Sequence, residues 1–342
     1  MKDFIYKVNE SFGTNVISFI SLSGGKNSKV LKIICDNHKE YILKQYFSHT
    51  LDQRNRLKVE FDCLKFLHNE NISCVPKPLL QNEEYNYAIF EYINGKKIES
   101  EDVSFKDIDM LVNFLSKLNV LKLKTEAKKF KAASEACFSI KAIIENIENR
   151  VNRLLQVKKN DSEIYELLLD FIHKEFKPCF IEIQQWCFKQ ELNWKEDISL
   201  NERILSPSDY GFHNSLRLSD KIIFVDFEYF GWDDPAKMIC DFLIHPAMSL
   251  SVDIKKYFFN SILRKINNNS RLEKRVVTVY PLFALKWCMI FLNEFVPELL
   301  LRRKFSGNYS DNLVNIQTNQ LNKSIKLLKK VMNQYENFPY RK

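Results

Sequence analysis

The stretch of sequence that decides the fold is LSPSDYGFHN at residues 205–214, followed by FVDFE at residues 224–228. Asp209 and Asn214 are five positions apart, and Asp226 comes twelve positions after Asn214. The apolar run that ends in Asp226 predicts a short β-strand with a carboxylate at its end. Each of these three residues alone is typical of an ordinary turn or strand end. As an ordered set they predict a polar site built from two carboxylates and an amide.

This set matches the chemical needs of phosphoryl transfer from ATP. The reaction requires backbone donors over the phosphates, a fixed cation, oxygen ligands for Mg²⁺ and an acidic group near the attacking hydroxyl. Asp209 can orient the hydroxyl and accept its proton, while Asn214 and Asp226 offer the hard oxygen ligands that Mg²⁺ prefers. The interpretation therefore predicts ATP and Mg²⁺ as cofactors.

The N-terminal part reads as a meander of three strands, at residues 16–20, 30–34 and 41–47. Gly24 and Gly25 join the first two strands and would let backbone N–H groups approach phosphate oxygens closely. A plain Gly-Gly hairpin is the alternative interpretation. A further strand is predicted at residues 87–92.

Lys44 lies in the third predicted strand, where a charged side chain is costly unless it is paired. Glu60 follows 16 positions later, on a helix predicted over residues 51–68. A lysine and a glutamate that each face solvent are the alternative, so the two residues carry the hypothesis only as a pair.

These segments, in this order, resemble the aminoglycoside/choline kinase family. That family has H-G-D-x-x-x-x-N in its catalytic loop, then two hydrophobic residues and D-x-E, and residues 230–241 resemble its G-x-x-D-P-x-x-D continuation. The resemblance spans about residues 16–250 and implies an α+β, protein-kinase-like fold of two lobes. A strand-rich nucleotide-binding lobe is expected at residues 1–94, and a mostly helical lobe with the catalytic loop, metal site and acceptor site at residues 95–342.

The resemblance also implies roles for single residues. Lys44 and Glu60 would serve the nucleotide, and the adenine would bind to the backbone from Glu91 to Ile93. Asp234 and Asp241 are expected to hold the helix that follows the metal site.

Two departures from the family pattern leave alternatives open. Pro207 stands where the family has a histidine that braces the loop, and Ser208 stands where it has a glycine. His213 either compensates or packs, and His245 is expected to be a core histidine without chemistry. A degenerate, nucleotide-binding pseudokinase is therefore the alternative to an active small-molecule kinase. A protein kinase is disfavoured because helix-like sequence follows residues 234–235 at once, without an activation segment.

Composition narrows the class of protein. A chain of 342 residues with 45% hydrophobic and 27% charged residues can form two lobes. Its eight cysteines are scattered without a metal-type spacing, and no apolar secretory segment follows Met1. A reducing, cytoplasmic location is expected.

Charge and hydropathy argue against two classes of partner. The formal net charge is +8, but lysines and glutamates alternate without a continuous basic stripe, so no nucleic-acid partner is expected. The apolar stretch 276–301 contains charged residues and prolines, so a buried helix is expected and not membrane insertion. The oligomeric state is left open.

The expected partner is a small molecule with a hydroxyl acceptor. Residues 107–203 are predicted to be almost wholly helical, interrupted at Pro178, and to set acceptor specificity. Lysines crowd residues 122–131 with only Glu126 against them, which favours a carbohydrate-like compound or an amino alcohol over a polycationic aminoglycoside. Residues 161–202 hold ten acids against four lysines and would reverse this if they line the pocket. The segments around Asp209 and Asp226 also look like a bacterial subgroup of the family associated with surface carbohydrates.

Overall fold

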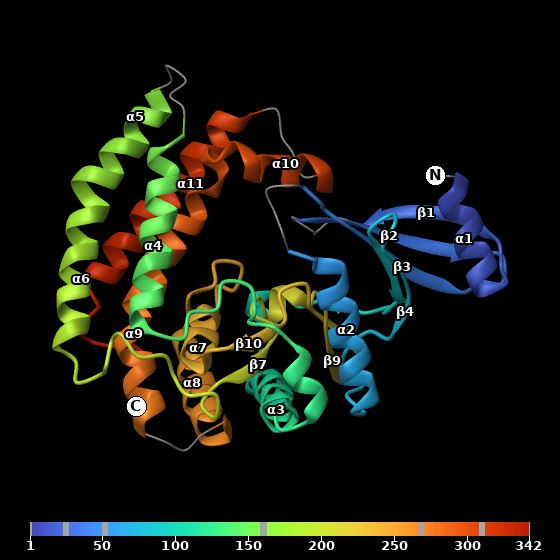
Figure 1. The fold of residues 1–342 in the computed structure, drawn as a ribbon, viewed down its shortest axis with the longest axis horizontal. Coiled ribbons are helices and arrows are strands. Elements are labelled where there is room, and N and C mark those ends of the chain that lie inside the picture. Colours follow the sequence, from blue (N-terminus) through green and yellow to red (C-terminus); the bar gives the residue numbers. More distant parts are fainter. Residues whose placement is uncertain are drawn as a thin grey trace. The chain divides into compact units, whose positions relative to one another are not determined.

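The computed structural model describes residues 2–22, 27–49, 54–157, 163–266, 270–307 and 312–341. The fold is α+β, with an N-terminal region rich in antiparallel sheet and a helical C-terminal region, as predicted (Figure 1). Contacts divide the chain into unit 1 (Met1–Lys97, Asn214–Phe230 and Leu300–Tyr309) and unit 2 (Ile98–His213, Gly231–Leu299 and Ser310–Lys342). Residues 214–230 thus group with the N-terminal strands. The single lobe boundary between residues 94 and 95 stays a prediction.

Unit 1 contains a five-stranded antiparallel sheet in the order β1-β2-β3-β5-β4. Its strands are β1 (Val16–Leu22), β2 (Ser28–Cys35), β3 (Glu40–Tyr46), β4 (Pro78–Asn82) and β5 (Tyr87–Glu91). The predicted meander and the strand at residues 87–92 are confirmed, with small shifts at their ends. Strand β4 was not predicted, because Pro76 and Pro78 look like the end of a helix; as the last strand in the order, β4 tolerates a proline at its first position.

Alternation along β3 separates the two faces of this sheet. Leu43 packs with Val8 of helix α1 (Lys2–Phe12) in one cluster of buried residues. Lys44, the next residue, points to the opposite face and reaches Glu60 on helix α2 (Arg56–Asn69). The predicted helix 51–68 therefore begins at Arg56, where Asn55 caps it by accepting the Lys58 N–H at 3.0 Å. Residues 51–53 lie outside the described residues, and α1 was not predicted.

A second, three-stranded sheet completes unit 1. It consists of β6 (Lys96–Lys97), β8 (Ser215–Leu218) and β9 (Lys221–Phe224), in the order β6-β8-β9. Gly95 is required at its edge, because a Cβ there would lie 2.9 Å from the Cβ of Leu216. The Phe224 N–H donates to the Cys74 carbonyl at 2.8 Å, which fastens the β8–β9 hairpin to the segment after α2. The hairpin expected before Asp226 is confirmed.

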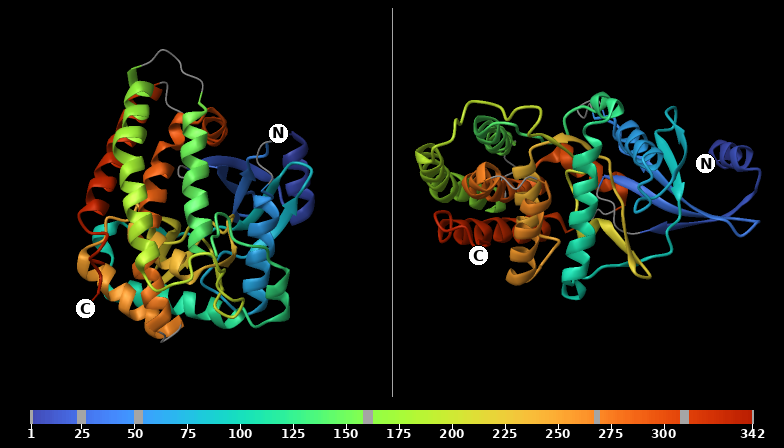
Figure 2. Two further views of the ribbon diagram at one scale, coloured as in Figure 1. Left: turned by 60° about the vertical axis from the view of Figure 1, so that its left-hand side comes forward. Right: turned by 90° about the horizontal axis from the view of Figure 1, so that it is seen from below.

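Unit 2 is built mainly from helices. They are α3 (Phe105–Leu121), α4 (Ile140–Leu155), α5 (Glu163–Asp170), α6 (Lys177–Lys189), α7 (Pro235–Ile244), α8 (Val252–Ile266), α9 (Ser270–Phe291) and α11 (Leu313–Met332), while α10 (Pro297–Ser306) begins in unit 2 and ends in unit 1. Strands β7 (Ile204–Ser206) and β10 (Gly231–Asp233) pair antiparallel. Helix α9 contacts α4, α6, α7 and α11, and the views agree on its central place among them (Figure 2).

The prediction for residues 107–203 is partly wrong. Residues 122–139 and 190–203 are mostly irregular, with one short 3₁₀ turn at Thr125–Lys129. Pro178 does not end the helix: a π-helical turn at Phe171–Phe176 joins α5 directly to α6. A proline ring clashes with the carbonyl four residues earlier, and the wider π turn gives it room.

Helix α9 accounts for the most hydrophobic stretch of the chain. Ser270–Phe295 is long and apolar enough to cross a membrane by length and composition. However, 72% of its apolar window is buried within the protein, which is typical of a core helix. By this criterion the stretch is only weak evidence for a membrane span.

Helix α7 carries a buried lysine that is held by two acids. Lys237 Nζ lies 2.8 Å from Asp233 Oδ2 and 3.1 Å from Asp241 Oδ2, and the side chains of Lys237 and Asp233 are 1% and 0% exposed. Burial alone would lower the pKa of Lys237, but the two carboxylates raise it above its usual range. The ammonium is therefore the charge that keeps these acids inside unit 2.

We expect Lys237→Met to destabilise the protein by about 3–5 kcal/mol, because Asp233 would remain buried as an uncompensated charge. Urea unfolding followed by circular dichroism measures the change. Lys174→Met is the matched control, since Lys174 pairs with Asp170 in the same i,i+4 spacing but with both side chains more than half exposed. Equal losses of stability in the two variants would show that Lys237 does not compensate a buried charge.

Candidate active site

Lys44 is the centre of a buried charge cluster in unit 1. Its Nζ lies 2.7 Å from Glu60 Oε2, 2.5 Å from Asp226 Oδ1 and 3.6 Å from Glu228 Oε2. Burial opposes the charge on Lys44, but the three carboxylates raise its pKa well above the usual value. The structure thus forms the expected Lys44–Glu60 pair and adds Asp226, which is 182 positions away in the sequence.

Glu60 organises this cluster. Its Oε2 accepts hydrogen bonds from Lys44 Nζ and from the Tyr46 hydroxyl at 2.8 Å, and its Oε1 accepts the Phe227 N–H at 3.2 Å. The residue is 3% exposed. Glu60 therefore ties strand β3 to the backbone directly after Asp226.

Asp226 and Asn214 lie beside each other on the hairpin. The Val225 N–H donates to the Asn214 carbonyl at 3.0 Å, so Asn214 faces the residue that precedes Asp226. The backbone of Asp226 is left-handed, with φ at 69°, and its side chain is 34% exposed. An uncommon backbone conformation of this kind often marks a functional position.

Three residues of the cluster were not among the predicted site residues. Glu228 is buried, and burial together with the charge on Asp226 raises its pKa to about 7. Asn27 Nδ2 donates to Glu228 Oε1 at 3.0 Å, and Arg56 Nε lies 3.6 Å from the same oxygen. The D-x-E pattern could have identified Glu228. Sequence carries no signal for Arg56 or Asn27, because only the fold brings them to this carboxylate.

The residues predicted to bind nucleotide are only partly described. Gly24 and Gly25 lie outside the described residues, between β1 and β2. Glu91 ends β5, where its N–H donates to the Lys77 carbonyl at 2.9 Å. Ile93 follows β5 and is half-buried.

The donor set of unit 1 fits a divalent cation with a preference for oxygen. Carboxylate oxygens of Glu60, Asp226 and Glu228 lie within 4.8 Å of one another. Oε2 of Glu228 is buried and has no hydrogen-bond partner in the described part of the chain. Hard oxygen ligands of this kind suit Mg²⁺. Asp226, Asn214 and Glu228 are the residues that would hold it, since both oxygens of Glu60 are engaged.

The loop with Asp209 belongs to unit 2 and follows strand β7. Ser208 has a left-handed backbone with φ at 66°, which explains why a glycine suits this position in the family that the sequence resembles. Ser208 Oγ accepts a hydrogen bond from the buried Lys237 Nζ at 3.0 Å and donates to the Ser134 carbonyl at 3.0 Å. Lys237 thus braces the loop at a point next to Pro207.

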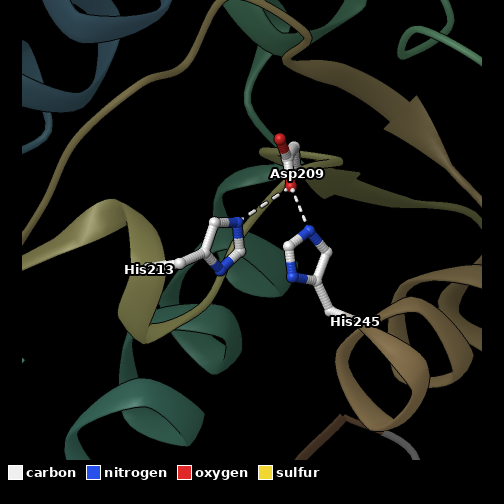
Figure 3. Close-up of side chains that lie close together, drawn as sticks. All are labelled: Asp209, His213 and His245. Carbon is white, nitrogen blue, oxygen red and sulfur yellow. Dashed lines mark hydrogen bonds and ion pairs between the residues drawn. The ribbon is translucent and has the colours of Figure 1, made fainter. Parts of the chain in front are cut away.

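Two histidines converge on Asp209 (Figure 3). Asp209 Oδ1 lies 3.0 Å from His213 Nε2 and 3.4 Å from His245 Nε2. Burial disfavours the charged carboxylate, but the hydrogen bonds of the two imidazoles outweigh this and lower the pKa of Asp209. His245 was expected to be a core histidine without chemistry; the structure places its Nε2 beside Asp209, a contact that sequence could not show because it depends on where α7 ends.

The two acids expected to hold α7 have different roles. Asp234 caps its N-terminus by accepting the Ala236 N–H at 2.8 Å, and Arg275 Nη2 lies 2.6 Å from its other oxygen. Asp241 instead sits within α7, where it pairs with Lys237 and accepts the Trp287 indole N–H at 2.9 Å. The prediction is confirmed for Asp234 and wrong for Asp241.

A comparison with protein-family models finds no match, and a comparison with curated sequences finds none either. Solved structures do match the fold. An ethanolamine kinase of Plasmodium vivax is 17% identical, with a TM-score of 0.61, over 96% of this chain and 86% of its own. The choline kinase LicA of Streptococcus pneumoniae is 15% identical, with a TM-score of 0.60, over 96% and 99%.

A spectinomycin phosphotransferase in complex with ADP and spectinomycin is 12% identical, with a TM-score of 0.63, over 93% of this chain and 98% of its own. At these identities the likeness concerns the fold. The chain therefore has the fold shared by choline and ethanolamine kinases and aminoglycoside phosphotransferases, the family that the sequence around Asp209 and Asp226 resembles.

Proposed function

We propose that this protein is an ATP-dependent phosphotransferase that moves the γ-phosphoryl group to a hydroxyl of a small molecule. The observation that carries the proposal is the buried Lys44, held between Glu60 and Asp226. A fixed cation next to a metal-binding carboxylate is what the phosphates of a nucleotide require. The structural likeness to small-molecule kinases supports the same reaction class.

In this proposal the residues of unit 1 bind the nucleotide and its metal. Lys44 offers its ammonium to phosphate oxygens, and Glu60 holds Lys44 in place. Asp226, Asn214 and Glu228 would hold Mg²⁺, which would neutralise charge on the phosphates. The backbone of Glu91 to Ile93 is proposed to receive the adenine, and the turn with Gly24 and Gly25 to cover the phosphates.

Asp209 is proposed to act on the acceptor. Its carboxylate orients the hydroxyl and accepts the proton as the new O–P bond forms and the bond to the ADP leaving group breaks. The low pKa of Asp209 keeps the carboxylate ionised and ready to accept a hydrogen bond. Asp209 and Asn214 are five residues apart, so the residue proposed to act on the acceptor and a residue proposed to bind the metal are close in the sequence.

For the acceptor we propose a carbohydrate-like compound or an amino alcohol. Two imidazoles contact Asp209 Oδ1, and His245 packs edge-on against Trp287 at 4.8 Å between ring centroids. Part of the acidic stretch 161–202 lines a cavity of about 60 Å³ in unit 2, together with Lys122, Arg271 and Arg275. Arg271 Nη1 lies 3.2 Å from Glu202 Oε1, so part of this acidic charge is already paired, which weakens the case for a polycationic substrate. A reducing cytoplasm, proposed from the eight free cysteines, would supply the ATP.

A pseudokinase is the second candidate, because Pro207 replaces the histidine of the family pattern. The chain keeps Asp209, Asn214 and Asp226 of the family pattern, and these residues favour an active kinase. ATP turnover against a panel of sugars, amino alcohols, nucleosides and aminoglycosides separates the two. Nucleotide binding without any transfer would favour the pseudokinase.

We expect Asp209→Asn to abolish transfer while ATP affinity stays within about threefold, because this residue faces the acceptor and not the nucleotide. Transfer is measured with the best acceptor of the panel and ATP affinity by calorimetry. Undiminished turnover would remove Asp209 from the mechanism.

Asp226→Ala should instead weaken the binding of Mg²⁺-ATP, since it removes a charged ligand of the cation. We expect a loss of about tenfold or more, whereas affinity for ATP measured with EDTA should change far less. Calorimetry with and without Mg²⁺ makes the comparison. Equal affinities of wild type and variant for Mg²⁺-ATP would contradict the metal role.

Lys44→Met should lower kcat/KM for ATP by about 100-fold or more, because a preorganised charge is lost from the phosphates. The single variant also leaves Glu60 buried without its ion pair and should be less stable. The double variant Lys44→Met/Glu60→Gln serves as control: it should regain part of the stability without regaining activity. Recovery of activity along with stability would show that Lys44 has only a structural role.

A further inference from the structure

His213 and His245 form a stacked pair that meets the carboxylate of Asp209. The two rings are 3.9 Å apart between centroids and parallel within 10°. Both Nε2 atoms face the same oxygen, Asp209 Oδ1. His213 comes from the turn directly after the loop, and His245 from the end of α7, so the pair is set by tertiary structure (Figure 3).

The tautomer of His245 follows from its own hydrogen bonds. The Ala247 N–H donates to His245 Nδ1 at 3.2 Å, so Nδ1 is an acceptor and carries no proton. In the neutral ring the proton must then be on Nε2, which faces Asp209. The ring is also fixed on its other side, where Trp287 packs edge-on and donates its indole N–H to Asp241.

The same three residues have the composition of a transition-metal site, and their ligand atoms lie within 4.8 Å of one another. The ring geometry argues against this use. The lone pair of an imidazole nitrogen lies in the plane of its ring, and a bound ion lies near that plane. Two stacked rings that are parallel within 10° share no such position. The arrangement therefore suits two N–H donors on one oxygen.

We propose that His213 and His245 are positioning residues, which clamp Asp209 by donating two Nε2–H groups to its Oδ1. They take over the bracing task of the histidine in the family pattern, whose place Pro207 occupies in this chain. The proposal rests on the proposed function for its catalytic meaning. The clamp fixes the rotamer of the carboxylate, so the acceptor hydroxyl meets it in one orientation. His245 contributes most to fixing the carboxylate, because its own ring is held in place by Ala247 and Trp287.

Two variants of His245 separate the donor from the ring. His245→Phe keeps a ring against His213 and Trp287 but has no N–H, while His245→Gln has an N–H at similar reach but no ring. We expect His245→Phe to lower kcat by about 10- to 100-fold with little change in KM for ATP. His245→Gln should stay within about threefold of wild-type kcat. His173→Gln, at an exposed position of unit 2, controls for unspecific effects.

A purely structural role would give the reverse order, with His245→Phe active and His245→Gln impaired in step with its loss of thermal stability. That result would overturn the proposal. So would stoichiometric zinc in the purified wild-type protein that disappears in His245→Phe.

Long-range ¹H–¹⁵N spectra of the imidazoles test the clamp without any turnover. We expect the Nε2–H tautomer for His245 in wild type, and a shift of its Nε2–H signal in Asp209→Ala, which removes the acceptor oxygen while the Ala247 N–H still donates to Nδ1. An Nδ1–H tautomer would overturn the clamp. If the tautomer is as expected but wild type transfers phosphate to no acceptor, the proposed function fails while the clamp on Asp209 stands.

Discussion

The buried charge of Lys44 is the constraint on which unit 1 depends. An ammonium that is almost out of contact with water must be compensated by carboxylates at close range. Glu60 on α2 and Asp226 after β9 supply this compensation, at 2.7 and 2.5 Å. The alternation of β3 places Lys44 on the α2 side of the sheet, and the chain returns to this side with residues 214–230. One ion-pair cluster thus joins three segments that are far apart in the sequence.

A second buried lysine has the same structural role in unit 2, where it compensates buried carboxylates. Lys237 compensates Asp233 and Asp241 and also donates to Ser208 in the loop that carries Asp209. Ser208 and Asp226 both have left-handed backbones, a conformation that costs energy for residues other than glycine. Each of these strained positions lies beside a buried lysine whose contacts hold the surrounding segment.

The absence of a family motif residue does not imply the absence of its physical task. A histidine two positions before Asp209 is missing, yet Asp209 is contacted by two other histidines and its loop by Lys237. Helix α7 provides both supports, with Lys237 in its body and His245 at its end. For this reason Pro207 weighs less against an active enzyme than the loop sequence suggests.

The sequence by itself determined the fold class and the segments that carry polar chemistry. Apolar runs between turns showed the strand of Lys44 and the strand that precedes Asp226. The metal and hydroxyl roles that the spacing of Asp209, Asn214 and Asp226 predicts stay predictions. Strand β4 was not predicted because its proline looked like the end of a helix. The irregular stretches at 122–139 and 190–203 were not predicted because local periodicity does not show where packing interrupts a helix.

Only the tertiary structure decided which residues surround these groups. The carboxylate of Glu228 is contacted by Arg56 and Asn27. His245 contacts Asp209, which lies 36 positions earlier in the sequence. Such contacts depend on how helices and hairpins pack, and packing brings together residues whose separation along the chain carries no pattern. A buried polar group needs a partner, but the sequence alone does not name the one it finds.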